Sequence, residues 1–466
     1  MTIITTHKSY SLGTKKVLDI MFSLLNLDEY ISQLKEAGVD LVKLAKLIIS
    51  FKMENPDTTF SISACATWGN QPEILRYFGL EPFDEQTLYR AVRTIGDNFE
   101  STLKYLEKQV FSHIPTKPSA IFIDWTTAVL WGLHASLGAY GYSKAKRTDK
   151  HQVTIGAAMV SKPYCIPVGL TLQAGNITDM IHFRRTLIQI SKELGEDTII
   201  VFDKGASSQT NFELVEAVGL KYLTSLRFNK TLDRHIEKFW DSEIVCINDT
   251  ETDEMKKLYA MTIRYPSRTD FIFFSQERKN NDIEAVRREV RKKFGVSDEY
   301  GMKKIKCNGT IQTQIIKYED IEDQIDEAVE AKLTGREGFF TLTTDADLTA
   351  EEAIKLYREK DAIEKFFHTM KTEMKLEPLR VRRNDAMKGV ILITYLVQLF
   401  LAIMKYLIPD IAKKSVKFII KELCCLTETV IYGRKGPKGK ITSNFTLTNT
   451  RILNFDFEKS WVKTEG

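Results

Sequence analysis

The chain has 466 residues, and its 43% hydrophobic and 27% charged residues are ordinary for a soluble globular protein of two to four structural units. The formal net charge of only +4 excludes a uniformly basic nucleic-acid-binding chain, although 66 Lys and Arg can still gather locally. The six cysteines are scattered without a C-x-x-C pair, which argues against a zinc site and for a reducing compartment, the cytoplasm.

Residues 1–115 are predicted to form a helical region. Apolar residues recur at three- and four-residue steps in 24–45 and 88–106, which is the pattern of amphipathic helices. A short helix is expected to begin at Asp84, whose carboxylate suits the capping position. Because this helix carries two arginines, it could be a DNA-recognition helix, but an ordinary surface helix would have the same pattern.

Residues 116–226 are predicted to form an α/β sheet domain. Ala120–Asp124 is a continuous apolar run that ends in a carboxylate, as expected of a strand buried on both faces, and Thr198–Asp203 has the same form. Further strands are expected at 152–160, 164–172 and 221–226, and helices at 178–194 and 211–218.

Asp124 and Asp203 therefore each close a buried strand. In open α/β sheets, ligands bind at the carboxyl ends of the strands. A single Asp in this place is often a turn former or a helix cap. Two of them, together with an acidic residue on a later packed helix, favour a functional site.

Between residues 227 and 336 the pattern changes to that of an inserted α+β module. Strands are expected at 259–265, 271–274 and 304–318, and helical or acidic segments at 283–293 and 319–330. The sheet domain is expected to resume over 337–408. The tail, 409–466, is rich in lysine and is expected to contain a loop at Gly433–Lys440.

The segment Gly389–Leu407 is nearly long and apolar enough to span a bilayer. It contains Thr394, Gln398 and Lys405, and no second such segment exists. A buried helix across the back of the sheet is therefore predicted, and no membrane segment.

A helix that carries an unusual polar face is predicted after Thr349, which forms a capping box with Glu352. Four residues at i, i+3, i+7 and i+14 fall near one face of that helix: Tyr357, Lys360, Glu364 and Lys371. A solvated face with ordinary ion pairs is the alternative. The apolar residues between these positions favour a packed helix whose polar face looks into a groove.

Three carboxylates, Asp124, Asp203 and Glu364, without His or Cys partners suit Mg²⁺ or Mn²⁺. Two such ions can activate an attacking hydroxyl and stabilise the leaving oxygen of a phosphodiester. The seven His residues pair with no nucleophile, and no G-x-S-x-G motif is present, so serine or cysteine nucleophile schemes find no support.

Two groups of cations could hold a polyanion beside these acids. The first group follows Asp124 in the chain and consists of Lys144, Lys146 and Arg147. The second group follows Glu364 and consists of Arg380, Arg382 and Arg383. Lys and Arg neutralise phosphates without reading the base sequence. Solvated surface is the alternative for both groups.

With these motifs the chain resembles DDE transposases of bacterial and archaeal insertion sequences that carry a Y-x2-R-x3-E-x6-K motif. The matching residues are Tyr357, Lys360, Glu364 and Lys371, with lysine in place of the usual arginine. Asp124 with Thr126 is similar to the first acidic motif, Asp203-Lys204-Gly205 to the second, and Gly141–Asp149 to a recurrent G-x-S-K-x-x-R-x-D stretch. The resemblance covers roughly residues 118–408.

The resemblance implies an α/β fold: a ribonuclease H-like mixed sheet flanked by helices, interrupted by the β-rich insertion and preceded by a helical region for DNA binding and dimerisation. It implies that Asp124, Asp203 and Glu364 bind two Mg²⁺ (or Mn²⁺) ions, and that Tyr357, Lys360 and Lys371 contact the terminal phosphates or a flipped end. The enzyme would cleave double-stranded DNA at terminal inverted repeats and join the 3′-hydroxyl ends to target DNA.

The resemblance also leads us to expect a homodimer in the synaptic complex and a cytoplasmic, nucleoid-associated protein. Three alternatives stay open at this point. The chain could be a ribonuclease H-like nuclease or resolvase that cuts without joining, a transposase-derived DNA-binding protein, or a purely structural protein.

Overall fold

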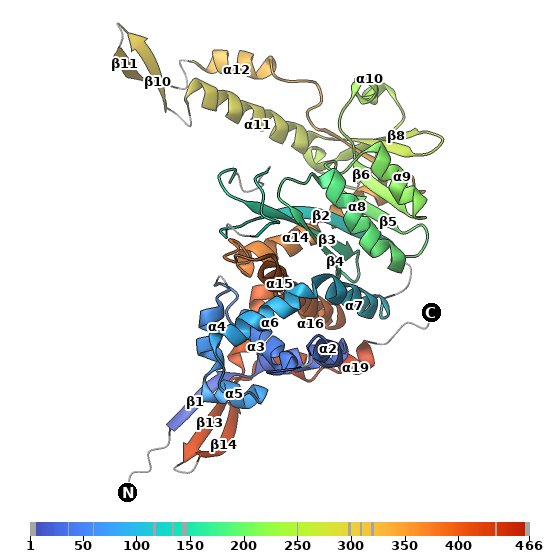
Figure 1. Ribbon diagram of the computed structural model, residues 1–466. Coiled ribbons are helices and arrows are strands. Elements are labelled where there is room, and N and C mark those ends of the chain that lie inside the picture. The colour runs from blue at the N-terminus through green and yellow to red at the C-terminus, as the bar shows by residue number, and fades with distance from the viewer. Residues whose placement is uncertain are drawn as a thin grey trace. The chain divides into compact units, whose positions relative to one another are not determined.

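The computed structural model describes residues 6–461 except for 36, 59, 115–117, 133–134, 142–146, 249, 297–299, 308–309, 318–320 and 434–435. The chain forms two compact units. The first comprises Met1–Leu220 and Arg358–Gly466, and the second comprises Lys221–Tyr357. Figure 1 follows the chain through both.

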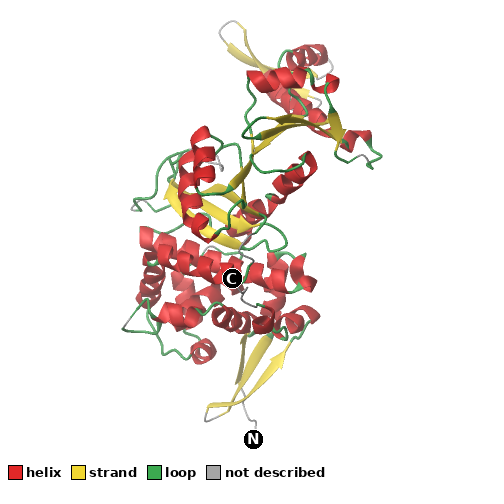
Figure 2. Cartoon of the chain, turned by 90° about the vertical axis from the view of Figure 1, so that its right-hand side faces the viewer, coloured by secondary structure: helices red, strands yellow, loops and turns green. Residues whose placement is uncertain are grey.

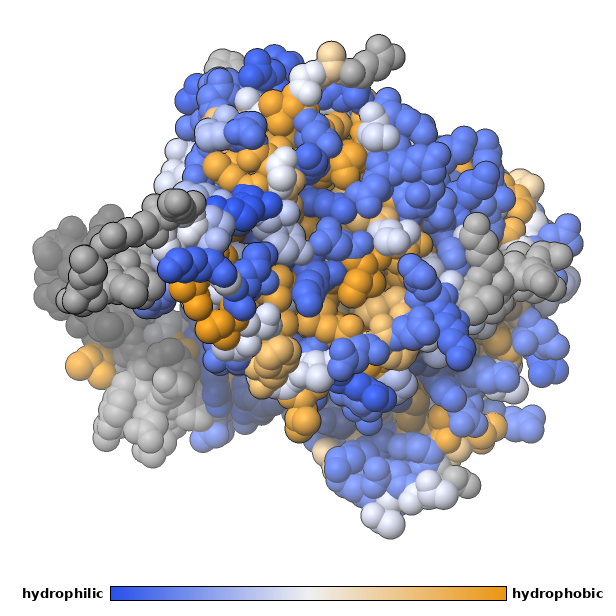
Figure 3. Space-filling view, turned by 90° about the horizontal axis from the view of Figure 1, so that it is seen from below, coloured by the Kyte–Doolittle hydropathy of each residue, from blue (hydrophilic) through white to orange (hydrophobic). Residues whose placement is uncertain are grey.

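The N-terminal part of the first unit is mainly helical, as predicted, but the stretches 24–45 and 88–106 are each divided between shorter helices. Its helices are α1 (Gly13–Leu24), α2 (Leu27–Ser32), α3 (Leu41–Glu54), α4 (Ile62–Gly69), α5 (Pro72–Phe78), α6 (Glu85–Asp97) and α7 (Phe99–Phe111). Asp84 caps α6 as expected, because its carboxylate accepts a hydrogen bond from the Thr87 amide at 2.7 Å. Hydrophilic residues predominate on the face seen in Figure 3, with apolar residues interspersed. The apolar stripes of α1 and α3, such as Phe22 and Ile48, are fully buried.

The first described strand pairs with a hairpin from the C-terminal region in a small antiparallel sheet. Its strands are β1 (Thr6–Ser11), β13 (Thr427–Gly433) and β14 (Gly436–Ser443), in the order β1-β13-β14. The loop predicted at Gly433–Lys440 is wrong: its described residues belong to this hairpin. Gly436 has a φ of +118°, which only glycine adopts readily, and so the chain turns there back into a strand.

The main sheet of the first unit contains β2 (Ala120–Val129), β3 (Gln152–Val160), β4 (Pro167–Ala174) and β5 (Ile199–Phe202). The order is β4-β3-β2-β5, with β2 and β5 parallel and the other pairs antiparallel. Every residue of β2 and β3 is buried, which confirms the burial predicted for Ala120–Asp124 at the start of β2. The mixed α/β class is therefore confirmed, and Figure 2 shows helices beside these strands.

Helices cover both faces of this sheet. On one face, α8 (Asp179–Ile190) contacts β2, β3 and β4, and on the opposite face α14 (Asp361–His368) contacts β2 and β3. After β5, α9 (Gln209–Ala217) begins at Ser208, whose hydroxyl accepts from the Asn211 amide at 3.3 Å. The tail adds α16 (Pro409–Ala412), α17 (Val416–Cys425), α18 (Leu447–Leu453) and α19 (Phe457–Ser460).

The long apolar segment forms α15 (Asn384–Leu407), which is long and apolar enough to cross a membrane but is mostly buried within the protein. It packs against α3 and α6, and Tyr395 donates a hydrogen bond to the Pro167 carbonyl of β4 at 3.1 Å. A Cβ on Gly96 of α6 would lie 1.8 Å from the Asp385 carbonyl oxygen. Glycine therefore permits the close approach of α6 and α15, and the prediction of a buried core helix is confirmed.

Within the second unit the strands follow the order β6-β12-β9-β8-β7. Its elements are β6 (Lys221–Ser225), α10 (Lys230–Glu237), β7 (Ile244–Cys246), β8 (Leu258–Arg264), β9 (Thr269–Ser275), α11 (Gln276–Phe294), β10 (Tyr300–Cys307), β11 (Thr310–Lys317), α12 (Glu322–Glu330), β12 (Phe339–Thr344) and α13 (Ala350–Glu359). Its core includes Phe239, Ile272 and Phe274. The α+β content predicted for 227–336 is present, and the predicted domain boundaries stay predictions.

Candidate active site

Asp124 and Asp203 come from neighbouring parallel strands. The pairing of β2 with β5 places Ala120 opposite Ile199 and Phe122 opposite Val201. Continued by two residues, this register sets Asp124 opposite Asp203, which directly follows β5. Because paired residues of parallel strands project to the same face, the register brings the two carboxylates to one place on the sheet.

The face of the sheet on which Asp124 projects follows from its neighbour. The ring of Trp125 packs against His182 and Phe183 of α8, with centroid distances of 6.1 and 6.0 Å. Successive strand residues point to opposite faces, so Asp124 projects away from α8. That is the face on which α14 packs, and Asp124 is buried there.

Lys360 is the residue on which the predicted acids converge. It is only 4% exposed, and its Nζ donates to Glu364 Oε1 at 2.8 Å. Burial, the largest influence, lowers the pKa of Lys360, but the charges of Asp124 and Asp203 and the bond to Glu364 raise it above the ordinary value. One buried ammonium thus interacts with all three predicted carboxylates.

The helix that carries this motif is interrupted, which the sequence did not predict. The capping box is confirmed: the Thr349 amide donates to Glu352 at 2.8 Å, and the Glu352 amide donates to the Thr349 hydroxyl at 3.2 Å. However, α13 ends at Glu359 and α14 begins at Asp361. The Ile363 amide bonds to the Lys360 carbonyl at 3.0 Å, a three-residue step that tightens the turn.

The other residues of the motif lie on different elements. Tyr357 is on α13 and is the last residue of the second unit. Lys371 lies in a π-helical segment, η5 (Thr369–Glu373), and its ammonium donates to the Thr127 carbonyl of β2 at 2.8 Å. It also pairs with Glu377 at 2.9 Å. The single continuous helix predicted over Tyr357–Lys371 is therefore wrong, because a turn at Lys360 and the π-helical segment interrupt it.

Glu377 is a positioning residue that sequence reasoning missed. Its carboxylate pairs with Lys371 and also accepts from the Val129 amide at 2.7 Å. Two residues later, Leu379 exchanges backbone hydrogen bonds of 2.9 Å with β2 and its extension. These contacts fix the segment after α14 against the strand that carries Asp124. No motif in the sequence signals this role.

The predicted basic residues are placed in three ways. Arg380 lies over the ring of Trp131, 5.4 Å from its centroid, and Lys150 lies 5.7 Å from it. Trp131 is 53% exposed. Arg382 is exposed, whereas Arg147 and Arg383 form ion pairs with nearby Asp149 and Asp385. Lys144 and Lys146 lie outside the described residues.

Comparison with known proteins decides the family. A family model described as "Transposase DDE domain" matches residues 115–400. This chain belongs to the DDE transposase family. Among solved structures, it is similar to the piggyBac transposase in a cryo-EM structure of its synaptic complex with hairpin DNA, at 11% identity and a TM-score of 0.40. That match covers 88% of this chain and 76% of that chain. No curated protein matches.

The donor set of this DDE transposase fits a hard divalent cation, because all three candidate ligands are carboxylates. Among the residues that the structure describes, no three Asp, Glu, His or Cys side chains lie as they would around an ion. The Lys360 ammonium interacts with all three acids. The carboxylates of the site therefore suit a cation, and the buried ammonium of Lys360 lies in the negative potential that they produce.

Proposed function

We propose that this DDE transposase cleaves double-stranded DNA at the ends of an insertion sequence and joins the freed 3′-hydroxyl ends to target DNA. The observation that carries the proposal is the interaction of Asp124, Asp203 and Glu364 with one buried ammonium. The three acids come from β2, the end of β5 and α14, so the fold has to assemble them. An ordinary ion-paired helix surface does not require the two strand-end acids.

Asp124, Asp203 and Glu364 would hold two Mg²⁺ or Mn²⁺ ions. Such ions, when bound, activate the attacking hydroxyl and stabilise the leaving oxygen of a phosphodiester. Lys371 and Glu377 fix the segment after α14 against β2 and so help to keep Asp124 and Glu364 in place. A ribonuclease H-like arrangement of the catalytic domain is part of this proposal.

Phosphate binding is assigned to cations at the surface. Arg380 and Arg382 are exposed, and Arg147 and Arg383 have partly exposed side chains that can exchange an Asp partner for phosphate. Tyr357, Lys144 and Lys146 stay in the proposal as DNA contacts on the strength of the motifs alone. Lys360 is too deeply buried to serve as a first contact for DNA.

The proposal is tested with Asp124→Asn, Asp203→Asn and Glu364→Gln in the full-length protein. Each variant is expected to lose cleavage of a labelled DNA that carries the element's end, while gel-shift binding of that DNA persists. A variant that cleaves at a near wild-type rate would remove its residue from the site. A strand-transfer assay with pre-cleaved ends separates a transposase from a nuclease or resolvase that cannot join.

The proposed partners are the terminal inverted repeats of the element and its target DNA. A homodimer would hold two ends in the synaptic complex, and the protein would act in the cytoplasm at the nucleoid. Inverted repeats that directly flank the gene would support a mobile element. The mass of the protein bound to end DNA, measured by light scattering, tests the dimer.

A further inference from the structure

The burial of Lys360 sets it apart from a lysine that binds DNA phosphate. It stands in the chain between α13 and α14, and 4% of its surface is exposed. A buried ammonium is tolerated only where charges or hydrogen bonds replace its lost water. Here the replacement is Glu364 at 2.8 Å, together with the charges of Asp124 and Asp203. Lys360 is thus the counter-ion of the acids.

The ammonium of Lys360 interacts with three carboxylates, Asp124, Asp203 and Glu364. Carboxylates are also the ligands that hard divalent cations such as Mg²⁺ prefer. Lysine carries a compact charge on a flexible stem, whereas the arginine usual at this point of the motif is a planar fork that suits two-point phosphate contact. The lysine at position 360 therefore suits a place among carboxylates.

The two members of the Lys360–Glu364 ion pair differ in their freedom. The side chain of Lys360 is 5% exposed, whereas that of Glu364 is 57% exposed. Glu364 can therefore turn away from Lys360 without disturbing the core. Glu364 can therefore exchange its hydrogen bond with Lys360 for a bond to a divalent cation.

We propose that Lys360 is a positioning residue that stands in for a divalent cation among Asp124, Asp203 and Glu364, and that Glu364 exchanges its bond with Lys360 for a bond to the cation when one binds. No covalent bond changes, and Lys360 keeps its proton. This inference rests on the proposed function, because it takes the same three acids as ligands. It follows that Lys360 stabilises the metal-free protein and weakens metal binding.

The experiment measures Mn²⁺ binding to the full-length protein by calorimetry and thermal unfolding with and without Mn²⁺. Lys360→Met is expected to bind Mn²⁺ at least about tenfold more tightly, because a positive charge next to the ion is removed. Its metal-free form should unfold at a lower temperature than wild type, and Mn²⁺ should raise that temperature by more. The matched control is Lys365→Met, since Lys365 pairs with Asp361 at the exposed surface of the same helix. It should behave as wild type.

Lys360→Gln gives a second neutral variant, so the test does not depend on the folding of Lys360→Met. If both neutral variants bind Mn²⁺ no more tightly than wild type, while Asp124→Asn weakens binding, the inference about Lys360 is overturned and the metal site stands. If Asp124→Asn leaves Mn²⁺ binding unchanged, or wild type binds none, the proposed metal site is overturned and this inference with it.

Discussion

The ammonium of Lys371 donates a hydrogen bond to the backbone carbonyl oxygen of Thr127, 2.8 Å away. Thr127 lies three residues after Asp124 on the same strand, β2. A lysine that the motif alone assigns to DNA phosphate is thus used, in the folded protein, to hold the segment that follows Glu364 against the strand of the first acid.

Lys371→Met is therefore expected to slow cleavage about tenfold or more while end-DNA affinity stays within about twofold, because 1.4 kcal/mol of lost positioning corresponds to a factor of ten. Glu377→Gln should have a similar effect, and the double variant should cost little more than either alone, since the two residues act as one pair. Cleavage rates and gel-shift affinities decide this. A direct phosphate contact would instead weaken binding and lower its salt dependence.

Arg380 and Trp131 are expected to contribute to DNA binding in two different ways, one through charge and one through the aromatic ring. Arg380→Ala should weaken binding and reduce the slope of log K against log salt by about 0.9, the value for one phosphate contact. Trp131→Ala removes the ring under Arg380 and Lys150 without removing charge. It should weaken binding and leave the slope unchanged. Fluorescence anisotropy with end DNA at several salt concentrations measures both, with Lys417→Ala on α17 as control. An unchanged slope in Arg380→Ala would exclude its phosphate contact.

The sequence predicted the two strands next to the candidate acids better than it predicted the surroundings of those acids. Strands β2 and β5 could be predicted because a strand buried on both faces is a local pattern, a continuous apolar run, and Asp124 and Asp203 were proposed as site residues because they end these two runs. The burial of Lys360 has no local signal: it depends on a turn between two helices and on strands far away in the chain. The hairpin at β13 and β14 was missed for a similar reason, since β1, its partner, lies about 420 residues earlier.

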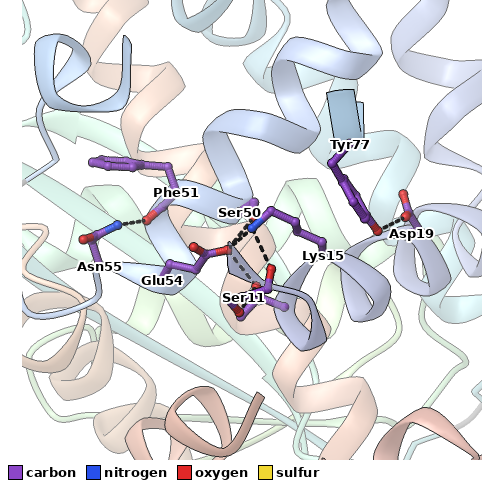
Figure 4. A network of polar contacts seen from close by, with 9 residues as sticks. Ser11, Lys15, Asp19, Ser50, Phe51, Glu54, Asn55 and Tyr77 are labelled. Atoms are coloured by element: carbon purple, nitrogen blue, oxygen red, sulfur yellow. Dashed lines mark hydrogen bonds and ion pairs between the residues drawn. The ribbon is translucent and has the colours of Figure 1, made fainter. Parts of the chain in front are cut away.

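An ion pair between the fully buried Lys15 and the largely buried Glu54 joins α1 and α3. As Figure 4 shows, Lys15 reaches Glu54 and the Ser11 carbonyl, and Ser50 also donates to Glu54. Lys15→Met leaves a largely buried carboxylate without its cation and is expected to cost about 3 kcal/mol of unfolding free energy. Lys15→Met with Glu54→Gln should cost less, because the neutral amide still accepts from Ser50. Chemical denaturation of the three proteins measures this, and equal losses in the single and double variants would contradict it.

The burial of Glu107 on α7 is expected to make the free energy of unfolding depend on pH. Its carboxylate lines a cavity of about 350 Å³, is buried, and accepts a hydrogen bond from Gln189 at 3.0 Å. Burial, only partly offset by the bond from Gln189, raises the pKa of Glu107 to about 8. The folded protein therefore binds one proton more than the unfolded chain between about pH 4.5 and pH 8. Stability that is present at acid pH is lost as the pH rises through this range.

Glu107→Gln mimics the protonated acid and keeps the acceptor for Gln189. It is expected to match wild type near pH 5 and to be more stable by a few kcal/mol at pH 9, since each pKa unit corresponds to about 1.36 kcal/mol. Thermal unfolding from pH 5 to pH 9 measures the difference. Glu100→Gln is the control, because Glu100 lines the same cavity with an exposed side chain that pairs with Lys388. A constant difference between Glu107→Gln and wild type across this range would show that Glu107 is ionised in the folded protein throughout.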